Sequence, residues 1–223
     1  MIKLTNVTKI YKTGVRALND VNLTIEPGEF VYVIGTTGAG KSTFIKAIAL
    51  NCILAQGLNT ALCSSYKCKF SKVVTSMAIK DDILEGDSYF IAEIKSLKRL
   101  LNSLNGEIRV LAFIDEILKG TNTVERIAAS ASILDYGKES KAKILVATHD
   151  MELTEMLGEK YDNYHFQEKV TDDEVIFDFK LYSGPATTRN AIKLLKTIGY
   201  NSDIINAAEN SARYFLENGK WNC

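Results

Sequence analysis

The chain has 223 residues, which suffices for one large domain or two small ones with a buried core. Hydrophobic residues make up 46% and charged residues 24%, a composition typical of soluble globular proteins. The 27 lysines and arginines balance the 27 acidic residues, so no overall charge attracts the chain to nucleic acid or to an anionic membrane.

The compartment is indicated by what the sequence lacks. No apolar run approaches the roughly 18–20 residues of a membrane span, and residues 1–5 lack the apolar core of a signal peptide. The four cysteines show no C-x-x-C spacing and are too sparse for a disulfide scaffold; they are Cys52, Cys63, Cys68 and Cys223. We therefore expect a cytoplasmic protein with reduced thiols and no membrane-spanning segment. Cys52 falls on the apolar face of a predicted helix, so we expect it in the core.

Short strands are predicted for residues 1–34. Residues 3–11 alternate loosely between apolar and polar side chains, and residues 19–25 alternate well. A Pro-Gly turn signal at 27–28 precedes an apolar run over 30–34. This pattern favours an antiparallel flap beside a main sheet.

A glycine-rich turn follows that run. Residues 35–42 read GTTGAGKS, which matches G-x-x-x-x-G-K-[ST] between a strand and a helix. Glycines let successive backbone N–H groups point at phosphate oxygens, and the helix adds the positive end of its dipole. Lys41 would reach the β- and γ-phosphates, and the Ser42 hydroxyl would ligate Mg²⁺. A chance glycine turn is the alternative, and its flanks disfavour it. The residues expected to bind nucleotide here are Gly35, Thr36, Thr37, Gly38, Ala39, Gly40, Lys41, Ser42 and Thr43.

The rest of the chain alternates between helices and strands. Helical spacing predicts helices over residues 43–56, 87–104, 123–136, 150–157 (capped by Asp150), 187–197 and 202–217. Apolar runs predict a strand over 70–77, buried strands over 110–114 and 143–147, and a hairpin of edge strands over 161–168 and 174–182. The apolar face of the first helix comprises Ile45, Ile48, Ala49, Cys52 and Ile53. Together they predict a single domain, 1–223, with a three-layer α/β P-loop NTPase fold: a mostly parallel central sheet, an N-terminal antiparallel flap and C-terminal helices.

Acidic side chains and a histidine follow two of the predicted buried strands. Asp115 ends one strand and Glu116 comes next, while His149 ends the other. The carboxyl ends of parallel strands meet at one edge of a sheet, so these side chains should lie near the glycine turn. Asp115 would hold Mg²⁺ opposite Ser42, through a water. For Asp115 and Glu116 the alternative is a solvated acidic turn, and for His149 it is a surface or core histidine. We interpret the other histidine, His165 on a predicted edge strand, as structural.

The N-terminal segment resembles FtsE-like ABC ATPases. The carrying residues are MIKLTNVTKIY over 1–11, ALNDVNLTI over 17–25 and GEF over 28–30, so the resemblance covers about residues 1–45. It implies that Tyr11 stacks on the adenine; the alternative is a strand residue packed into the flap. Beyond this segment the resemblance ends, because no glutamine ends the next strand and no Leu-Ser-Gly-Gly-Gln occurs.

The remainder resembles the ATPase domain of the MutS mismatch-repair family. The motifs are DDILEGDSYFIAE over 81–93, IDEILKGTNT over 114–123 and ATHDMEL over 147–153. This resemblance covers about residues 41–223 and overlaps the first in the shared glycine turn. The two resemblances indicate an engineered or recombined chimaera with its seam within residues 40–46; a divergent natural protein is the alternative.

Roles follow from these resemblances. Glu116 would polarise the attacking water, and His149 would contact the γ-phosphate. Ser88 would reach the γ-phosphate of a neighbouring subunit, although its position at a helix start is also explained by an N-cap role. The loop 120–123 would touch that subunit. Thr37 departs from the asparagine of MutS proteins, which places MutS-type γ-phosphate positioning in question.

The expected function is Mg²⁺-dependent hydrolysis of ATP to ADP, weak in a monomer because isolated half-sites lack the partner's contribution. There are two alternatives. One is a homodimerisation module that is gated by nucleotide and has a composite site, and the other is a protein that folds but has no evolved activity. The helices over 187–217 resemble the MutS dimerisation tail or simply cover the sheet. No mismatch-reading segment is expected, and the absence of Asn-Lys-x-Asp favours ATP over GTP.

Overall fold

The computed structural model describes residues 2–26, 31–34, 39–77, 89–138, 140, 142–158, 160–171, 175–186 and 190–222. Its strands are β1 (Ile2–Ile10), β2 (Arg16–Ile25), β3 (Val31–Ile34), β4 (Lys72–Ser76), β5 (Val110–Asp115), β6 (Lys143–Thr148), β7 (Asp162–Val170) and β8 (Val175–Ser183). Its helices are α1 (Lys41–Leu58), α2 (Tyr89–Leu104), α3 (Thr123–Lys138), α4 (Met151–Leu157), α5 (Ala191–Ile198) and α6 (Ser202–Asn218). Each predicted helix and strand has a counterpart in this set, whereas the predicted turn at 27–28 lies outside the described residues.

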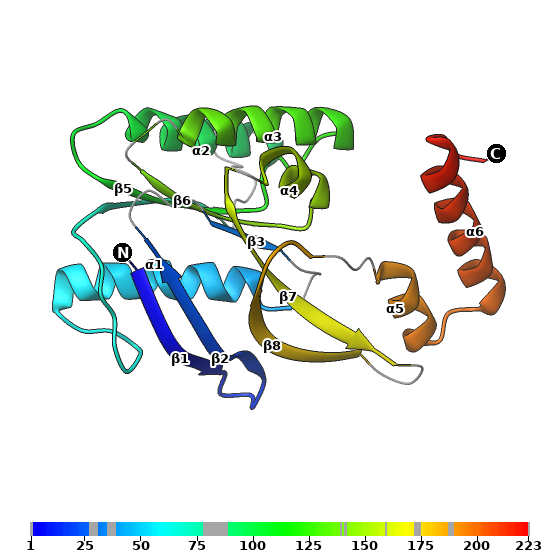
Figure 1. The fold of residues 1–223 in the computed structure, drawn as a ribbon, viewed down its shortest axis with the longest axis horizontal. Helices are drawn as coiled ribbons and strands as arrows, with labels where there is room; N and C mark the ends of the chain where they lie inside the picture. The colour runs from blue at the N-terminus through cyan, green and yellow to red at the C-terminus, as the bar shows by residue number, and fades with distance from the viewer. Residues whose placement is uncertain are drawn as a thin grey trace.

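A mostly parallel sheet forms the centre of the molecule. Its strand order is β4-β5-β6-β3-β7-β8, and only β8 runs antiparallel to its neighbour. β1 and β2 form a separate antiparallel pair beside it, which confirms the predicted flap (Figure 1). The prediction that β7 is an edge strand is wrong, because β7 pairs with β3 on its other side. Only β8 of that hairpin lies at the sheet edge.

Side chains of the central strands alternate between two cores, as the two-residue period of a strand requires. Tyr32 and Ile34 belong to the core beneath α2, α3 and α4, whereas Val31 and Val33 belong to the core shared with α1, β1 and β2. Figure 1 shows the corresponding layers, with α2, α3 and α4 on one side of the sheet and α1 with the β1–β2 pair on the other. The continuous apolar runs in β3, β5 and β6 therefore reflect burial on both faces.

Helix α1 packs one stripe of side chains against the sheet. Ile45, Ile48, Ala49 and Cys52 are buried as predicted, but Ile53 is 52% exposed. Successive residues on a helix are separated by about 100°, so Ile53 is turned away from the stripe that contains Cys52. The apolar spacing alone therefore overestimated the width of the buried face.

Helices α5 and α6 stand at the end of the molecule and do not cover the sheet. Figure 1 shows α6 apart from the sheet, next to α5. Ile205 is the only buried residue recorded in α6, and α5 has none. The alternative that these helices cover one face of the sheet is therefore wrong. Among the helices of the described residues, none combines the length and apolar character needed to cross a bilayer.

Candidate functional site

The first turn of α1 meets the end of β5. Ser42 Oγ donates a hydrogen bond to Asp115 Oδ1 at 2.7 Å, and Lys46 Nζ lies 3.8 Å from Asp115 Oδ2. A hydroxyl and a carboxylate oxygen side by side are hard donors that suit Mg²⁺, which proteins bind through one or two side chains together with water and phosphate oxygens. Within the described ranges no three histidine, cysteine or acidic side chains gather around one point, so a metal bound by side chains alone is not indicated there. The donor set therefore fits Mg²⁺ better than a soft metal.

Lys41 is buried at the start of α1, and Gly40 before it lies against the flap. Lys41 is 5% exposed, and burial lowers the pKa of its ammonium group, an effect that the charges of Glu116 and Asp115 partly offset. Gly40 adopts φ +106°, and a Cβ there would lie 2.7 Å from the Ala17 carbonyl oxygen of β2. Glycine is therefore required at this point both for its backbone angle and for the close approach of the flap.

Glu116 and His149 form the second contact of the site. His149 Nδ1 donates to Glu116 Oε2 at 2.7 Å. Burial alone would raise the pKa of Glu116, but the hydrogen bond and charge of His149, with a contribution from Lys41, lower it overall. The same hydrogen bond raises the pKa of His149. The two side chains therefore favour each other's charged forms.

Glu116 has an unusual backbone conformation that is fixed by a hydrogen bond to β6. Glu116 has φ +60°, in the left-handed region that non-glycine residues rarely occupy. Its N–H donates to the Ala147 carbonyl at 2.9 Å, so the pairing of β5 with β6 continues one residue past the strand. Such strained residues persist where the surrounding structure enforces them, and they cluster at functional sites.

A partly buried arginine extends the network behind His149. Arg126 of α3 donates to Asp150 Oδ1 at 2.6 Å, and the same carboxylate oxygen lies 3.8 Å from His149 Nε2. Asp150 precedes α4 as predicted, but its side chain makes no capping bond, so the predicted cap is wrong. The charge-assisted bond to Arg126 takes the carboxylate instead. We did not predict Arg126, and no local pattern marks it, because α3 also carries Glu125 in its first turn and Lys138 in its last.

Tyr11 reaches the start of α1 from the end of β1. Its hydroxyl lies 3.4 Å from Thr43 Oγ1, the residue is 45% exposed, and Lys9 Nζ lies 5.4 Å from the centroid of its ring. Tyr11 is therefore not buried within the flap, and its role stays a prediction. An exposed aromatic ring next to the first turn of α1 is available to stack on a flat ligand.

Not every predicted site residue can be assigned a structural place. Gly35, Thr36, Thr37, Gly38 and Ser88 lie outside the described residues, while Ala39 is buried.

Local contacts hold the conformation of the loop 120–123. Asn122 accepts a hydrogen bond from the Glu125 N–H at 3.0 Å and donates to Glu125 Oε2, which is a reciprocal cap of α3. Gly120 packs so closely on α2 that an added Cβ would lie 2.9 Å from the Phe90 Cβ. A further residue that we did not predict, the buried Glu93 of α2, accepts the Lys119 N–H at 3.1 Å and fixes the loop on the other side.

Comparison with known proteins identifies the family. The family model described as MutS domain V matches residues 31–215. The chain is similar to proteins named DNA mismatch repair protein MutS, with 28% identity over 209 residues to that of Clostridium perfringens and 30% over 209 residues to that of Clostridium beijerinckii. Each alignment covers 91% of this chain, so both include part of residues 1–45. They cover only 23% and 22% of these relatives, so the chain spans less than a quarter of their length. By the extent of the family match, the chain belongs to the MutS domain V family.

Proposed function

We propose that this chain binds ATP with Mg²⁺ and hydrolyses it to ADP and phosphate, as the ATPase part of a mismatch-repair protein. The observation that carries the proposal is the 2.7 Å hydrogen bond between Ser42 and Asp115, which brings a hydroxyl from the motif GTTGAGKS beside a carboxylate at a strand end. These are the two oxygen donors that a P-loop site uses for its metal. The family match and the names of the relatives support the link to mismatch repair.

Each side chain has a role in this proposal. Lys41 binds the β- and γ-phosphates, and Ser42 and Asp115 would hold Mg²⁺. A bound Mg²⁺ supplies positive charge to the phosphate oxygens. Glu116 accepts a hydrogen bond from the attacking water and orients it, while His149 holds the Glu116 carboxylate in its ionised form. Tyr11 stacks on the adenine.

We further propose that hydrolysis is weak in the monomer and increases when two copies meet. The support is that apolar side chains of the C-terminal helices remain exposed: Ile204 by 53% and Leu216 by 69%. In this proposal Ser88 and the loop 120–123 complete the neighbour's site. A purely nucleotide-gated association module is the second candidate, and turnover that stays negligible at every protein concentration would favour it.

The dual resemblance leads to one more proposal, that residues 1–45 share an origin with ABC ATPases and were joined to a MutS-type domain. The family match leaves out residues 1–30, which is compatible with it, whereas the alignments to the MutS relatives extend into residues 1–45. The same resemblance implies the adenine contact, which the exposure of Tyr11 beside Thr43 supports. Tyr11→Ala should then weaken ATP binding, whereas Tyr11→Phe should preserve it because the ring is retained. Equal affinity for both variants and the wild type would refute the adenine contact.

The test of the main proposal is binding of a fluorescent ATP analogue with Mg²⁺ over a range of protein concentrations. Lys41→Ala should abolish saturable binding. Lys98→Ala is the control, since it removes a lysine from the exposed face of α2, and among the described residues Lys98 has no recorded contact with Ser42, Asp115 or Glu116. Circular dichroism should show that both variants keep the helical signal. Saturable binding by folded Lys41→Ala, or none by the wild type, would refute the proposal.

A further inference from the structure

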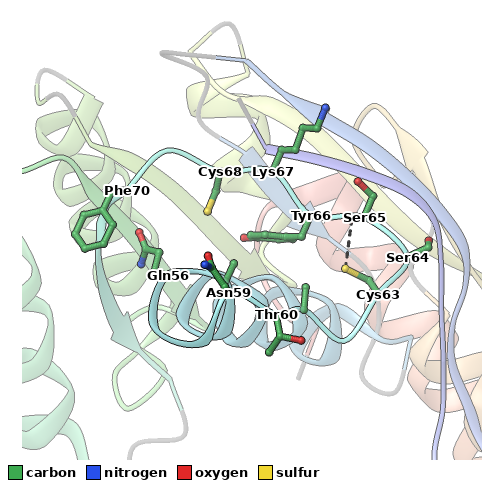
Figure 2. A pocket seen from close by; sticks show the side chains of 12 residues that line it. Gln56, Asn59, Thr60, Cys63, Ser64, Ser65, Tyr66, Lys67, Cys68 and Phe70 are labelled. Carbon is green, nitrogen blue, oxygen red and sulfur yellow. Dashed lines mark hydrogen bonds between the residues drawn. The ribbon is translucent and has the colours of Figure 1, made fainter.

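The segment between α1 and β4 contains two cysteines and covers a third. Residues 59–71 form neither helix nor strand, and their one recorded bridge joins Lys67 to Lys3 of β1. A pocket of about 760 Å³ opens between this segment and the end of α1, and Cys63 and Cys68 are among its lining residues (Figure 2). Small solutes can therefore reach these two thiols.

Cys68 lies against a buried thiol of α1. The sulfur atoms of Cys52 and Cys68 are 3.9 Å apart, and Cys52 is fully buried while Cys68 is partly exposed. Cys63 is placed differently: its sulfur lies 3.3 Å from the Ser65 carbonyl oxygen. Figure 2 shows the Cys63 and Cys68 sulfurs at opposite ends of the Tyr66 ring. Geometry therefore selects one pair among the three thiols.

We propose that Cys52 and Cys68 form an oxidisable dithiol, which a peroxide converts into a disulfide through the pocket. In the first step the Cys68 sulfur attacks hydrogen peroxide, the O–O bond breaks, and a sulfenic acid and one water result. In the second step the Cys52 sulfur attacks the Cys68 sulfur, the S–O bond breaks, and the oxygen leaves as water with the remaining protons. The two thiols lose two electrons, and the peroxide gains them.

The order of these steps follows from access and charge. Cys68 faces the pocket, whereas burial and the neighbouring Cys68 raise the pKa of Cys52 to about 12. Cys52 therefore rests as a neutral thiol that waits behind Cys68 as the resolving partner. The sulfurs must approach to about 2 Å to bond. The segment that carries Cys68 has no helix or strand to break, so it can supply this movement. Within the described residues no metal-binding cluster includes these thiols, which favours redox chemistry over metal binding.

Peptide mapping under non-reducing conditions tests the pairing. Trypsin cleaves after Lys46, Lys67 and Lys69, so Cys68 falls on the peptide 68–69 and the other two thiols fall on 47–67. In Cys63→Ser, any bond between these peptides must join Cys52 to Cys68. After titration with hydrogen peroxide we expect the linked peptides in the wild type and in Cys63→Ser, with the intact mass of a monomer. They should be absent in Cys68→Ser and after reduction with dithiothreitol. Loss of the link in Cys63→Ser, or a link found only between two chains, would overturn the proposal.

Thermal unfolding gives an independent readout. Oxidation closes a loop between residues 16 positions apart and fastens the segment to α1. The thermal midpoint of the wild type and of Cys63→Ser should therefore rise by several degrees on oxidation and return on reduction. The midpoint of Cys68→Ser, which also reports whether that variant folds, should not respond to peroxide. A linked protein whose midpoint is unchanged or lowered would contradict a bond formed within the native structure.

Discussion

At the residue scale, His149 and Glu116 titrate as a pair. The pKa of His149 lies above its ordinary 6.5 and that of Glu116 below its ordinary 4.5. Stabilisation from charged His149 is fully present below about pH 6.5 and is lost as the pH rises through the raised value. Stabilisation from ionised Glu116 is present above about pH 4.5 and is lost as the pH falls through the lowered value. The ion pair is therefore complete between the lowered pKa of Glu116 and the raised pKa of His149.

A proton NMR titration can measure this coupling directly, because the chain has only two histidines. In Glu116→Gln the pKa of His149 should fall back toward 6.5, since both the charge-assisted hydrogen bond and the carboxylate charge are lost. Comparison with His165→Asn assigns the two signals. If His149 titrates at the same pH in the wild type and in Glu116→Gln, the two side chains are not paired in solution.

The ion pair behind His149 leads to a stability prediction. The side chains of Arg126 and Asp150 are only 14% and 5% exposed. Arg126→Ala would leave the Asp150 carboxylate buried without its hydrogen-bonded partner, with His149 Nε2 3.8 Å away as its remaining cation, which should cost about 3 kcal/mol of unfolding free energy in urea titrations. Arg126→Lys should lose less, because it keeps the charge but not the planar guanidinium geometry.

Activity measurements separate positioning from stability in the same two variants. If Arg126 positions His149 through Asp150, Arg126→Ala should also shift the pH profile of ATP turnover at temperatures where the variant is fully folded. Arg126→Lys should restore that profile in part.

The stability prediction has its own contradicting outcome. Unfolding free energies of wild type and Arg126→Ala within about 0.5 kcal/mol of each other would contradict the ion pair between Arg126 and Asp150.

At the element scale, alanine substitutions at two glycines, one before α1 and one within it, should change the unfolding free energy in opposite directions. Gly40 has φ +106° and a Cβ there would meet the Ala17 carbonyl oxygen at 2.7 Å, whereas a Cβ at Gly57 within α1 would meet nothing within 4 Å. Gly40→Ala should destabilise the fold by about 1–3 kcal/mol through backbone strain and displacement of β2. Gly57→Ala should stabilise it by about 0.5–1 kcal/mol through helix propensity. Urea unfolding measures both, and destabilisation by both variants would show that α1 does not end as described.

The elements that the sequence predicted best are those with a strong local pattern. The five apolar residues before Asp115 and the run in β6 indicated strands buried on both faces, because such strands have apolar side chains on each side. β7 was predicted as an edge strand because it forms a hairpin with the next strand. Its second partner, β3, lies about 130 residues earlier in the chain, since Val31 pairs with Asp162. Asp150 was predicted as a cap because the rule is local, while its partner Arg126 lies on another helix. Local patterns do not show contacts that the tertiary structure sets, so the roles of Arg126 and Glu93 could not be predicted. The approach of Ser42 to Asp115 could be expected, because both residues belong to recognised motifs.

At the scale of the whole molecule, the end of α6 presents apolar side chains to solvent. Leu216 is 69% exposed, and the rings of Phe215 and Trp221 stack on each other at 4.4 Å between centroids. If this surface joins two copies, Leu216→Glu should weaken self-association at least tenfold in sedimentation velocity, because a charge would be buried at the contact. Asn206→Glu is the matched control, since it adds the same charge at an exposed position of the same helix. Equal sedimentation of the two variants would exclude α6 from the contact.

The position of β3 in the sheet also determines when the protein can fold during synthesis. β3 lies between β6 and β7, so Val31 pairs with Leu145 on one side and with Asp162 on the other. A ribosome must therefore deliver about 130 further residues before the central strand has both neighbours. Until then the apolar sequence VYVI lacks at least one of its pairing partners in the sheet. During this delay an unpaired strand can associate with other nascent chains. We therefore expect the domain to depend on chaperones until its last strands emerge.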